Sequence, residues 1–336
     1  MNSISNNLTG GISSEAPQFS VVIPLYNKAH TIVHTLSTVM RQNYADYEVV
    51  IVDDGSTDNG VQLIREHFKD PRIRIFHQEN AGVSVARNRG IEEAKGDWVA
   101  FLDADDEWLP DYLKYVVEAS DKYPECGMVI TGRMSQNYAT HEKKGFIPTE
   151  LKNKTSRIDF FDNPHVYVHI SATSIRRRIL ENKESWNRFI PSQKCNEDFY
   201  FLFAVALHTN VVYVGEFLSV YNGNVIGQAT SSLMTEQRLE DSILFHDRIM
   251  QEYARSSPRR SFMVFMRYEY RHIIKGLLIR KDYLSVKRYT NSMSGQILTT
   301  VLERFMYNNI SLNWMSLIYI NFTKLIWRMH GLPVTK

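Results

Sequence analysis

The chain has 336 residues, of which 43% are hydrophobic and 12% aromatic, enough to bury a large core as one elaborated catalytic domain or as two lobes. This composition excludes a disordered or collagen-like protein, and a formal net charge of +2 argues against a dedicated nucleic-acid binder. The charge is unevenly distributed: residues 233–336 hold 16 basic and 8 acidic side chains, so residues 1–232 carry a net charge of −6.

Residues 1–18 are rich in Asn, Ser and Gly and lack both the basic start and the apolar core of a secretory signal, so we interpret them as a flexible lead-in. The chain has 2 cysteines, Cys126 and Cys195, too few for a disulfide framework or, alone, for a thiolate metal cage. We expect both to be the reduced cysteines of a cytosolic protein.

Residues 19–133 alternate short β-rich runs with amphipathic segments. Strands are expected at 19–27, 47–56, 73–76, 98–106 and 128–131, and helices at 28–42, 56–68, 82–96 and 110–124. This alternation predicts an α/β fold with a Rossmann-like, mostly parallel sheet covered by helices on both faces. Ligands bind such sheets beyond the carboxyl ends of the strands, so we expect the chemistry at the polar residues that end these strands.

Residues 134–232 are less regular. A helix is expected from Asp198 to Leu207, followed by a strand pair near Val211–Val214 and Leu218–Tyr221. From Glu236 onward the apolar residues have helical spacing, so residues 233–336 are predicted to form a basic helical C-terminal region.

An acidic motif after the predicted strand Trp98–Leu102 is the strongest chemical feature of the sequence. It presents Asp103, Asp105 and Asp106 within residues 97–111, which include six acidic residues and no basic one. On a strand, Asp103 and Asp105 would point to the same side, where two carboxylates can bind one hard cation and the diphosphate that it holds. A bound Mg²⁺ or Mn²⁺ would relieve the repulsion between these carboxylates. The alternative is a solvated acidic turn.

Three other residues stand at places where a nucleotide could be bound. Asp54, at the end of the second predicted strand, can accept a hydrogen bond from a nucleobase imide or a ribose, or can serve only a capping turn. Tyr26, at the tip of the first strand, offers a surface on which a base can stack, although a rim aromatic is the commoner role. Arg87, in the third predicted helix, can pair with a phosphate or with the acidic motif.

In their order and spacing, the segments VVIPLYNK, VVIVDDGSTD, QENAGVSVARNRG and FLDADDE resemble the family 2 glycosyltransferases of the GT-A fold. Members of this family use a nucleotide-activated sugar and invert the anomeric centre. The resemblance covers residues 19–232 and implies a nucleotide-sugar-binding half, 19–133, and an acceptor-binding half that carries the base, 134–232. It also implies Mn²⁺ or Mg²⁺ as cofactor and, by family frequency alone, a UDP-sugar donor.

The resemblance assigns roles residue by residue. The residues expected to bind the nucleotide sugar are Pro24, Tyr26, Asn27, Asp54, Arg87, Asp103 and Asp105. Those expected to bind the metal are Asp105, the first choice, Asp103 and Asp106. The family's general base is the Asp of an ED pair that opens a helix, here Asp198, which would take the proton from an acceptor hydroxyl. A carboxylate at a helix N-terminus is also an ordinary capping element.

The sequence departs from the family after the last predicted strand. Many members carry a Tyr-Arg-x-His-like segment there, which helps to hold the diphosphate or the metal. In this chain Tyr221 is followed by Asn222, and no His is close by in sequence. Gln228, Thr230 or water would have to replace the missing ligand.

The C-terminal residues Ile310–Met329 are apolar but are interrupted by polar side chains, so a membrane-spanning helix is not expected. Helical spacing places Met315 and Ile318 on an apolar face and Asn313 and Ser316 on a polar one. The segment therefore predicts an amphipathic helix that either packs on the catalytic lobe or lies in a membrane interface. Other residues expected to support a membrane contact are Trp314, Trp327, Arg259, Arg260, Arg271, Lys275, Arg280, Lys281, Lys287 and Arg288.

We interpret the sequence as an inverting glycosyltransferase of cell-surface polysaccharide, O-antigen, capsule or glycolipid synthesis, with a saccharide or lipid-linked acceptor and no nucleic-acid partner. It is expected in the cytoplasm, and a peripheral position on the inner face of the membrane is a further hypothesis. One alternative is a haloacid-dehalogenase-like phosphohydrolase, whose DxDx(T/V) motif resembles DADDE, although Glu107 stands where that motif needs Thr or Val. The other is a non-catalytic nucleotide-sugar-binding subunit, against which the complete acidic motif and Asp198 argue.

Overall fold

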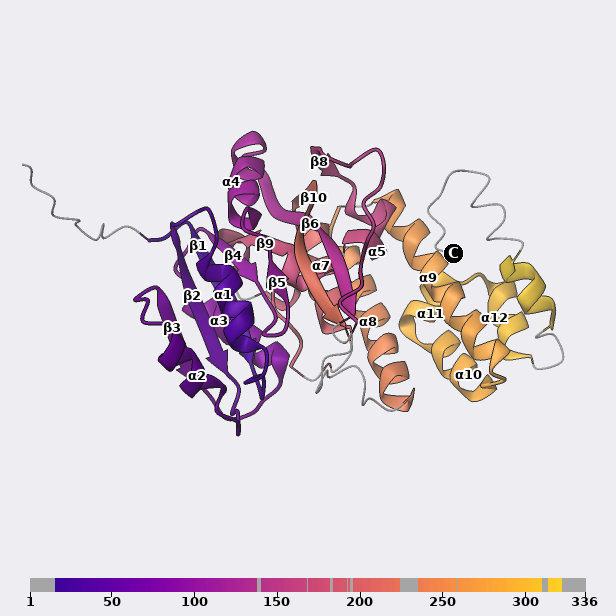
Figure 1. Cartoon of the computed structure of the whole chain (residues 1–336). Coiled ribbons are helices and arrows are strands. Elements are labelled where there is room, and N and C mark those ends of the chain that lie inside the picture. The colour runs from indigo at the N-terminus through magenta and orange to yellow at the C-terminus, as the bar shows by residue number, and fades with distance from the viewer. Residues whose placement is uncertain are drawn as a thin grey trace, which may run out of the picture.

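The computed structural model describes residues 16–137, 140–167, 169–181, 184–191, 193, 196–223, 235–257, 259–309 and 314–321. Its first part is an α/β fold built on one sheet, and its last part is helical and lies at the end of the molecule opposite to the first strands (Figure 1). The predicted α/β fold with a helical C-terminal region is confirmed. Most of the predicted lead-in, residues 1–15, and the residues Cys195, Gln228 and Thr230 lie outside the described residues.

The sheet has 10 strands, whose central path runs β3-β2-β1-β4-β9-β6-β10-β5, with β7 paired to β6 and β8 to β10. The strands are β1 (Phe19–Leu25), β2 (Tyr47–Asp53), β3 (Ile73–His77), β4 (Trp98–Phe101), β5 (Glu107–Trp108), β6 (Cys126–Asn137), β7 (Lys143–Gly145), β8 (Thr155–Ile158), β9 (Thr173–Arg176) and β10 (Asn210–Gly223). The boundary expected between residues 133 and 134 therefore falls inside β6, so the two expected halves share one strand.

The sheet is parallel where the sequence is regular and mixed elsewhere. Strands β1 to β4 pair in parallel, as the alternation of strands and helices predicts. Strand β9 is antiparallel to both β4 and β6, whereas β6 and β10 run parallel. The predicted strand pair at 211–221 is wrong: β10 is one strand of 14 residues, and a shift of its register with β6 between Val214 and Ser219 stands in place of the expected turn.

Helices cover both faces of the sheet, and the pleat of the strands assigns each side chain to one face. In β1, Val21 and Ile23 pack with helices α1, α2 and α4, whereas Val22 packs with α3 and α7. Gly90 of α3 lies against Val22 so closely that a Cβ there would clash with its Cγ1, and this close approach places Arg87 under the strand ends. These helices are α1 (Ile32–Met40), α2 (Gly60–His67), α3 (Val83–Glu93), α4 (Tyr112–Lys122) and α7 (Glu197–His208).

The helical C-terminal part continues the core formed by α3 and α7. Phe262 of α9 contacts Phe161 edge to face with ring centroids 4.9 Å apart, and Phe245 of α8 packs on Phe203 of α7. The remaining helices are α5 (Pro164–Tyr167), α6 (Arg177–Glu181), α8 (Thr235–Arg255), α9 (Arg260–Ile279), α10 (Tyr283–Asn291), α11 (Met293–Leu298), α12 (Val301–Asn308) and the short turns η1 (Phe160–Asp162), η2 (Ile170–Ala172) and η3 (Ser185–Asn187). Within the described ranges, the search for a helix long and apolar enough to cross a membrane finds none.

Candidate active site

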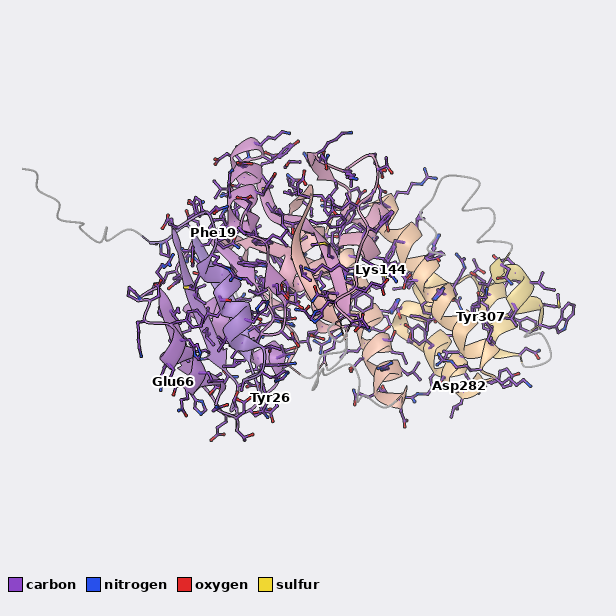
Figure 2. All side chains as sticks on the ribbon, in the orientation of Figure 1. Phe19, Tyr26, Glu66, Lys144, Asp282 and Tyr307 are labelled. Carbon is purple, nitrogen blue, oxygen red and sulfur yellow. The ribbon has the colours of Figure 1, made fainter. Side chains whose placement is uncertain are left out.

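The loop after β1 presents an exposed aromatic ring. Tyr26 has 47% of its surface exposed and lies at the edge of the molecule, where a base could stack on it (Figure 2). Asn27 follows with a φ of 50° and fastens the loop to the one after β2: its N–H donates to Ser56 Oγ at 3.1 Å, and its Oδ1 accepts from the Thr57 N–H at 2.8 Å. Pro24 is buried within β1, so it shapes the loop from below and offers no exposed surface.

Asp54 is buried and holds the segment that precedes α3 in place through hydrogen bonds. Its Oδ1 accepts from Gln78 Nε2 at 2.7 Å and from the Ala81 N–H at 2.9 Å, and its Oδ2 accepts from the Gly82 N–H at 2.9 Å. Gly82 has a φ of 92°, a conformation that glycine adopts without strain, and α3 begins directly after it. Asp54 therefore positions α3, and the contact with a nucleobase expected from the sequence stays a prediction.

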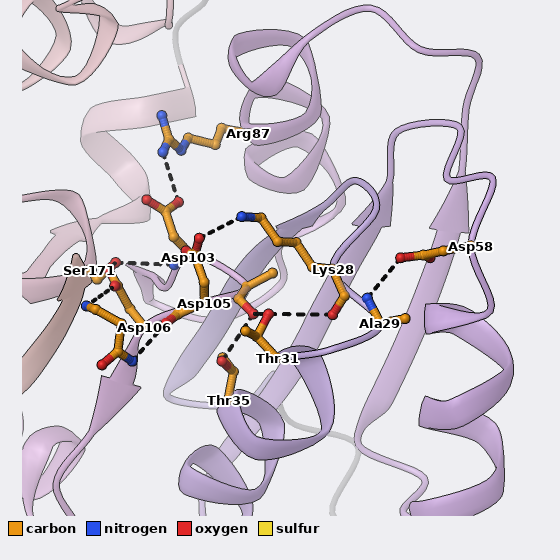
Figure 3. Close-up of polar contacts among 12 residues, drawn as sticks. Lys28, Ala29, Thr31, Thr35, Asp58, Arg87, Asp103, Asp105, Asp106 and Ser171 are labelled. Carbon is orange, nitrogen blue, oxygen red and sulfur yellow. Dashed lines mark hydrogen bonds and ion pairs between the residues drawn. The ribbon is translucent and has the colours of Figure 1, made fainter. Parts of the chain in front are cut away.

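The acidic motif is a turn and not the end of a strand. Strand β4 ends at Phe101, and the Asp106 N–H donates to the Asp103 carbonyl at 3.0 Å. Asp103 and Asp105 are therefore not strand residues, and the expectation that strand alternation points them to the same side is wrong. The turn nevertheless gathers the carboxylates, and the pKa of Asp105, raised first by burial, is raised further by the charge of Asp103. Figure 3 shows the three Asp side chains gathered in this turn.

Arg87 joins the acidic turn to the helix that carries Asp198. Its guanidinium donates to Asp103 Oδ1 at 2.7 Å and to Glu197 Oε1 at 3.0 Å, and it lies 5.2 Å above the ring of Phe189. The side chain is only 4% exposed. Burial alone would lower the pKa of Arg87, but Asp103 and Glu197 raise it above its usual value, so the cation is permanent. Arg87 thus forms a buried double ion pair, and its expected role as a phosphate ligand stays a prediction.

Asp105 and Asp106 have different environments. Asp105 Oδ2 is 2.7 Å from Lys28 Nζ, and its pKa is raised by burial, with Lys28 opposing the shift (Figure 3). Asp106 is 1% exposed, its Oδ2 accepts from Ser171 Oγ at 2.6 Å, and its Oδ1 accepts from the Asn222 N–H at 3.1 Å. Burial raises the pKa of Asp106 well above its usual value. Both oxygens of Asp106 therefore hold the turn together, and its expected role as a metal ligand stays a prediction.

Asp198 stands in the first turn of α7, as the sequence predicts. Its Oδ1 accepts from the N–H of Phe199 at 2.9 Å. The pKa of Asp198 is raised from its usual value to about 7, first by burial and then by the charge of Glu197, while Arg87 opposes the shift. An ordinary Asp, with a pKa of about 3.9, is a feeble base. The environment of Asp198 makes it a competent one near neutral pH.

Several site residues carry no recognisable signal in the sequence. His169 Nε2 lies 3.7 Å from Asp106 Oδ2, and burial lowers the pKa of His169 to about 3, so this imidazole is neutral. Arg133 of β6 is close enough to Asp106 and Asp198 for both to act on its pKa, which burial lowers. His169 lies in an irregular segment and Arg133 in the middle of a strand, so no motif distinguishes them. Lys28 directly follows the predicted Tyr-Asn pair and could have been found there.

The acidic turn can bind a divalent cation only together with a bound substrate that supplies further oxygen ligands. Among the described residues, no group of three His, Cys, Asp or Glu side chains is arranged to hold a metal ion. Asp103 and Asp105 remain as oxygen donors, partly exposed at 29% and 14%. Mg²⁺ and similar ions are commonly bound by one or two carboxylates together with substrate phosphates. The residues present fit that arrangement and do not form a cage made by the protein alone.

Comparison with known proteins decides the family. The profile of glycosyl transferase family 2 matches residues 20–183, the segment from β1 to just beyond α6. This segment is a family 2 glycosyltransferase domain. The match includes the acidic turn, Arg87 and Lys28, and ends before Asp198.

Curated relatives match parts of the chain. The uncharacterized glycosyltransferase YibD of Escherichia coli is 47% identical over 94 residues, 28% of this chain and 27% of YibD. The putative teichuronic acid biosynthesis glycosyltransferase TuaG of Bacillus subtilis is 41% identical over 104 residues, 30% of this chain and 41% of TuaG. The chain thus spans less than half of the length of each of these relatives.

Solved structures extend the likeness of fold to nearly the whole chain. Staphylococcus aureus TarS 1-349, in complex with UDP-GlcNAc, superposes with a TM-score of 0.70 at 16% identity and covers 95% of this chain and 93% of TarS 1-349. The mannosyltransferase PcManGT of Pyrobaculum calidifontis, in complex with GDP-Man and Mn²⁺, has a TM-score of 0.55 at 16% identity and covers 94% of this chain and 88% of its own. These structures share the GT-A fold of this chain. The likeness includes the helical C-terminal part, because each alignment covers at least 94% of the chain.

Proposed function

We propose that the protein is an inverting, metal-assisted glycosyltransferase that moves a sugar from a nucleoside diphosphate sugar to a saccharide or lipid-linked saccharide of the cell surface. The observation that carries the proposal is the bridge formed by Arg87, which links Asp103 of the acidic turn to Glu197, the neighbour of Asp198. A carboxylate with a pKa of about 7 is thereby held in one network with the carboxylates suited to a diphosphate and its cation.

The proposed reaction follows from these positions. Asp198 accepts the proton of the acceptor hydroxyl while that oxygen forms a bond to C1 of the donor sugar. The bond between C1 and the phosphate oxygen breaks on the opposite side, and its electron pair leaves with the nucleoside diphosphate, so the configuration at C1 is inverted. Mn²⁺ or Mg²⁺, when bound at Asp103 and Asp105, supplies positive charge for the leaving diphosphate. Tyr26 provides the stacking surface for the base.

The nature of the donor and acceptor is part of the proposal. TarS is described in complex with UDP-GlcNAc and TuaG as a teichuronic acid biosynthesis enzyme, which supports a UDP-sugar donor and a cell-surface polymer acceptor. The complex of PcManGT with Mn²⁺ supports metal dependence. A haloacid-dehalogenase-like phosphohydrolase is disfavoured because the acidic motif follows β4, the fourth strand, whereas that family's motif follows the first.

Asp198→Asn tests the proposal directly. A panel of UDP-, dTDP- and GDP-sugars with Mn²⁺ is screened for transfer or donor hydrolysis by the wild-type chain, and the active donor is then used with the variant. We expect loss of transfer with unchanged donor affinity by calorimetry. Asp121→Asn, an exposed carboxylate on α4, is the matched control and should behave as wild type. Full transfer by Asp198→Asn would remove the base assignment, and no turnover with any donor would remove the proposed activity.

We also propose that the helical C-terminal part rests on a membrane surface from the cytoplasmic side. Among the described residues, 12 large apolar side chains are exposed, and nine of these lie between Ile279 and Ile318. In the helical stretch 314–321, Trp314 and Ile318 are 63% and 60% exposed, whereas Ser316 is fully buried. The apolar face thus points outward, as an interfacial helix requires. Phe322, Trp327 and the rest of the predicted amphipathic helix lie outside the described residues.

The basic residues contribute less to this surface than their number suggests. Arg271 is buried in an ion pair with Glu303 at 2.6 Å, and Arg288 pairs with Glu236 and Glu240. Apolar contact is therefore proposed as the main attraction. A groove of about 740 Å³ opens on the same part of the molecule, lined by Asn291, Val301, Arg304, Phe305, Asn308 and Asn309.

Vesicle flotation tests the membrane proposal. Phe305→Glu with Leu302→Glu places two charges on the exposed face of α12, where both side chains are 60% exposed, so folding should be preserved. We expect the wild-type chain to float with vesicles that contain anionic lipid and the double variant to remain in the soluble fraction. Arg65→Gln with Lys69→Gln, which also changes the net charge by −2 at two exposed positions on the far side of the molecule, serves as the charge-matched control. Equal flotation of all three proteins would refute the proposed surface.

A further inference from the structure

Lys28 occupies the position at which the acidic turn would meet a cation. It lies in the loop between β1 and α1, directly after Tyr26 and Asn27. Its Nζ is 2.7 Å from Asp105 Oδ2, and both side chains are 14% exposed (Figure 3). The pair joins residues 77 positions apart in sequence, so the fold brings this ammonium to one of the two carboxylates proposed to bind the metal.

The two cations of the site are held in different ways. Arg87 is fixed by two carboxylates, lies over Phe189 and is 4% exposed, so its position is set by its surroundings. Within the described part of the chain, Lys28 pairs with one carboxylate only, that of Asp105. Lys28 also carries its charge on a flexible four-carbon stem, as a compact group with three rotatable donors. Lys28 can therefore exchange its partner, whereas Arg87 cannot.

The backbone beneath Lys28 is firmly placed. Its carbonyl accepts from the N–H groups of Thr31 and Ile32, at 3.1 and 2.9 Å, at the start of α1. The next residue, Ala29, donates its N–H to Asp58 Oδ2 at 2.8 Å. The loop thus does not depend on the ion pair with Asp105, and the side chain can move while its Cα stays in place.

Resting on the proposed function, we propose that Lys28 is an internal counter-ion of Asp105 that competes with the divalent cation and passes to the diphosphate of the donor when donor and cation bind together. In the free protein the ammonium neutralises Asp105 and weakens the binding of a cation alone, because two cations at one carboxylate oxygen repel each other. The incoming diphosphate offers the ammonium new oxygens within reach of the same stem.

This exchange of partners predicts two effects of opposite sign for Lys28→Met. Without its competitor, Asp105 should bind Mn²⁺ alone about tenfold more tightly, the size expected for one charge-assisted hydrogen bond. With Mn²⁺ saturating, UDP should bind about tenfold more weakly because one phosphate contact is lost. A lysine that only supports the fold would lower both affinities or change neither.

The experiment uses the full chain and two titrations. Binding of Mn²⁺ alone is followed by electron paramagnetic resonance, and binding of UDP at saturating Mn²⁺ by calorimetry. Lys28→Arg keeps the charge and should stay near wild type in both. Lys122→Met, which removes an exposed ammonium bonded to the Thr155 carbonyl on the outside of α4, is the matched control and should change neither.

The outcomes separate this inference from the proposed function. Tighter Mn²⁺ and weaker UDP binding in Lys28→Met support it. Unchanged or weaker Mn²⁺ binding in that variant, including no detectable binding in either protein, overturns it, as does unchanged UDP affinity. If the wild-type chain transfers sugar while these titrations fail, only the role of Lys28 is lost. If it neither binds UDP nor transfers sugar, the proposed function fails with it.

Discussion

Replacing Arg87 by Met should destabilise the protein more than any other single loss of a charge at the site. The substitution keeps the bulk of the side chain over Phe189 but leaves Asp103 and Glu197 without their shared cation. Removing one partner from a buried ion pair costs about 3–5 kcal/mol, and the lower end applies because Asp103 is 29% exposed. Because the entropy of unfolding scales with chain length, a loss of about 3 kcal/mol in this chain of 336 residues corresponds to a fall of about 4 °C in the thermal midpoint.

The control for Arg87→Met is available on the same helix. Arg89 pairs with Glu93 at 3.9 Å and is 34% exposed, so Arg89→Met should cost about 1 kcal/mol or less. Both variants are compared with wild type by urea and thermal unfolding. Adding Glu197→Gln to Arg87→Met should restore part of the stability, because one uncompensated charge is removed. If Arg87→Met is no less stable than Arg89→Met, the buried bridge does not have the strength assigned to it.

The remaining predictions concern pH and the nucleotide. The value of kcat/KM should fall about tenfold per pH unit below about pH 7. The reason is that Asp198 must be deprotonated to act as the base, and its pKa is raised to about 7. A flat profile between pH 5 and 7 would contradict the assignment. The same pKa shift affects stability in the opposite direction, because the folded state binds this proton more tightly than the unfolded chain does. The stabilising contribution of Asp198 is therefore full below about pH 4 and is lost as the pH rises through 7. In unfolding experiments at several pH values, Asp198→Asn should abolish this pH dependence. Tyr26→Ala should weaken UDP binding by about 10- to 100-fold through loss of stacking, whereas Tyr26→Phe should not, and equal calorimetric affinity in all three proteins would rule out a stacking role.

The first half of the fold could be predicted because its local patterns and its packing agree. Strands β1, β2 and β4 are buried on both faces, and their apolar runs are recognisable without knowledge of their neighbours. Beyond β6 the sheet becomes mixed. The 14-residue strand β10 continues through Gly215, which reads as a break between two apolar runs in the sequence but lies against the backbone of Leu151, a long-range contact that the sequence does not reveal.

The candidate site was predictable in its residue types but not in its connections. Asp103, Asp105 and Asp198 are marked by position in the chain, whereas the partners that decide their roles come from elsewhere. Ser171 and Asn222 donate hydrogen bonds to Asp106 from 65 and 116 residues away in sequence. No local pattern contains such pairings, so the sequence could not show that the three Asp side chains of the turn have different partners.

The Arg87 bridge also limits how the protein can be recombined. Acceptor choice is expected to depend on the segment after β6, which makes that segment attractive for exchange between relatives. The guanidinium spans 16 residues of sequence to Asp103 and 110 to Glu197, so it fixes the spacing between two pieces that a chimera would draw from different parents. A graft that brings a neutral residue at position 197 would leave Arg87 with half of its compensation, in a place that water hardly reaches. Chimeras should therefore be chosen first for an acid at this position and only then for their acceptor loops.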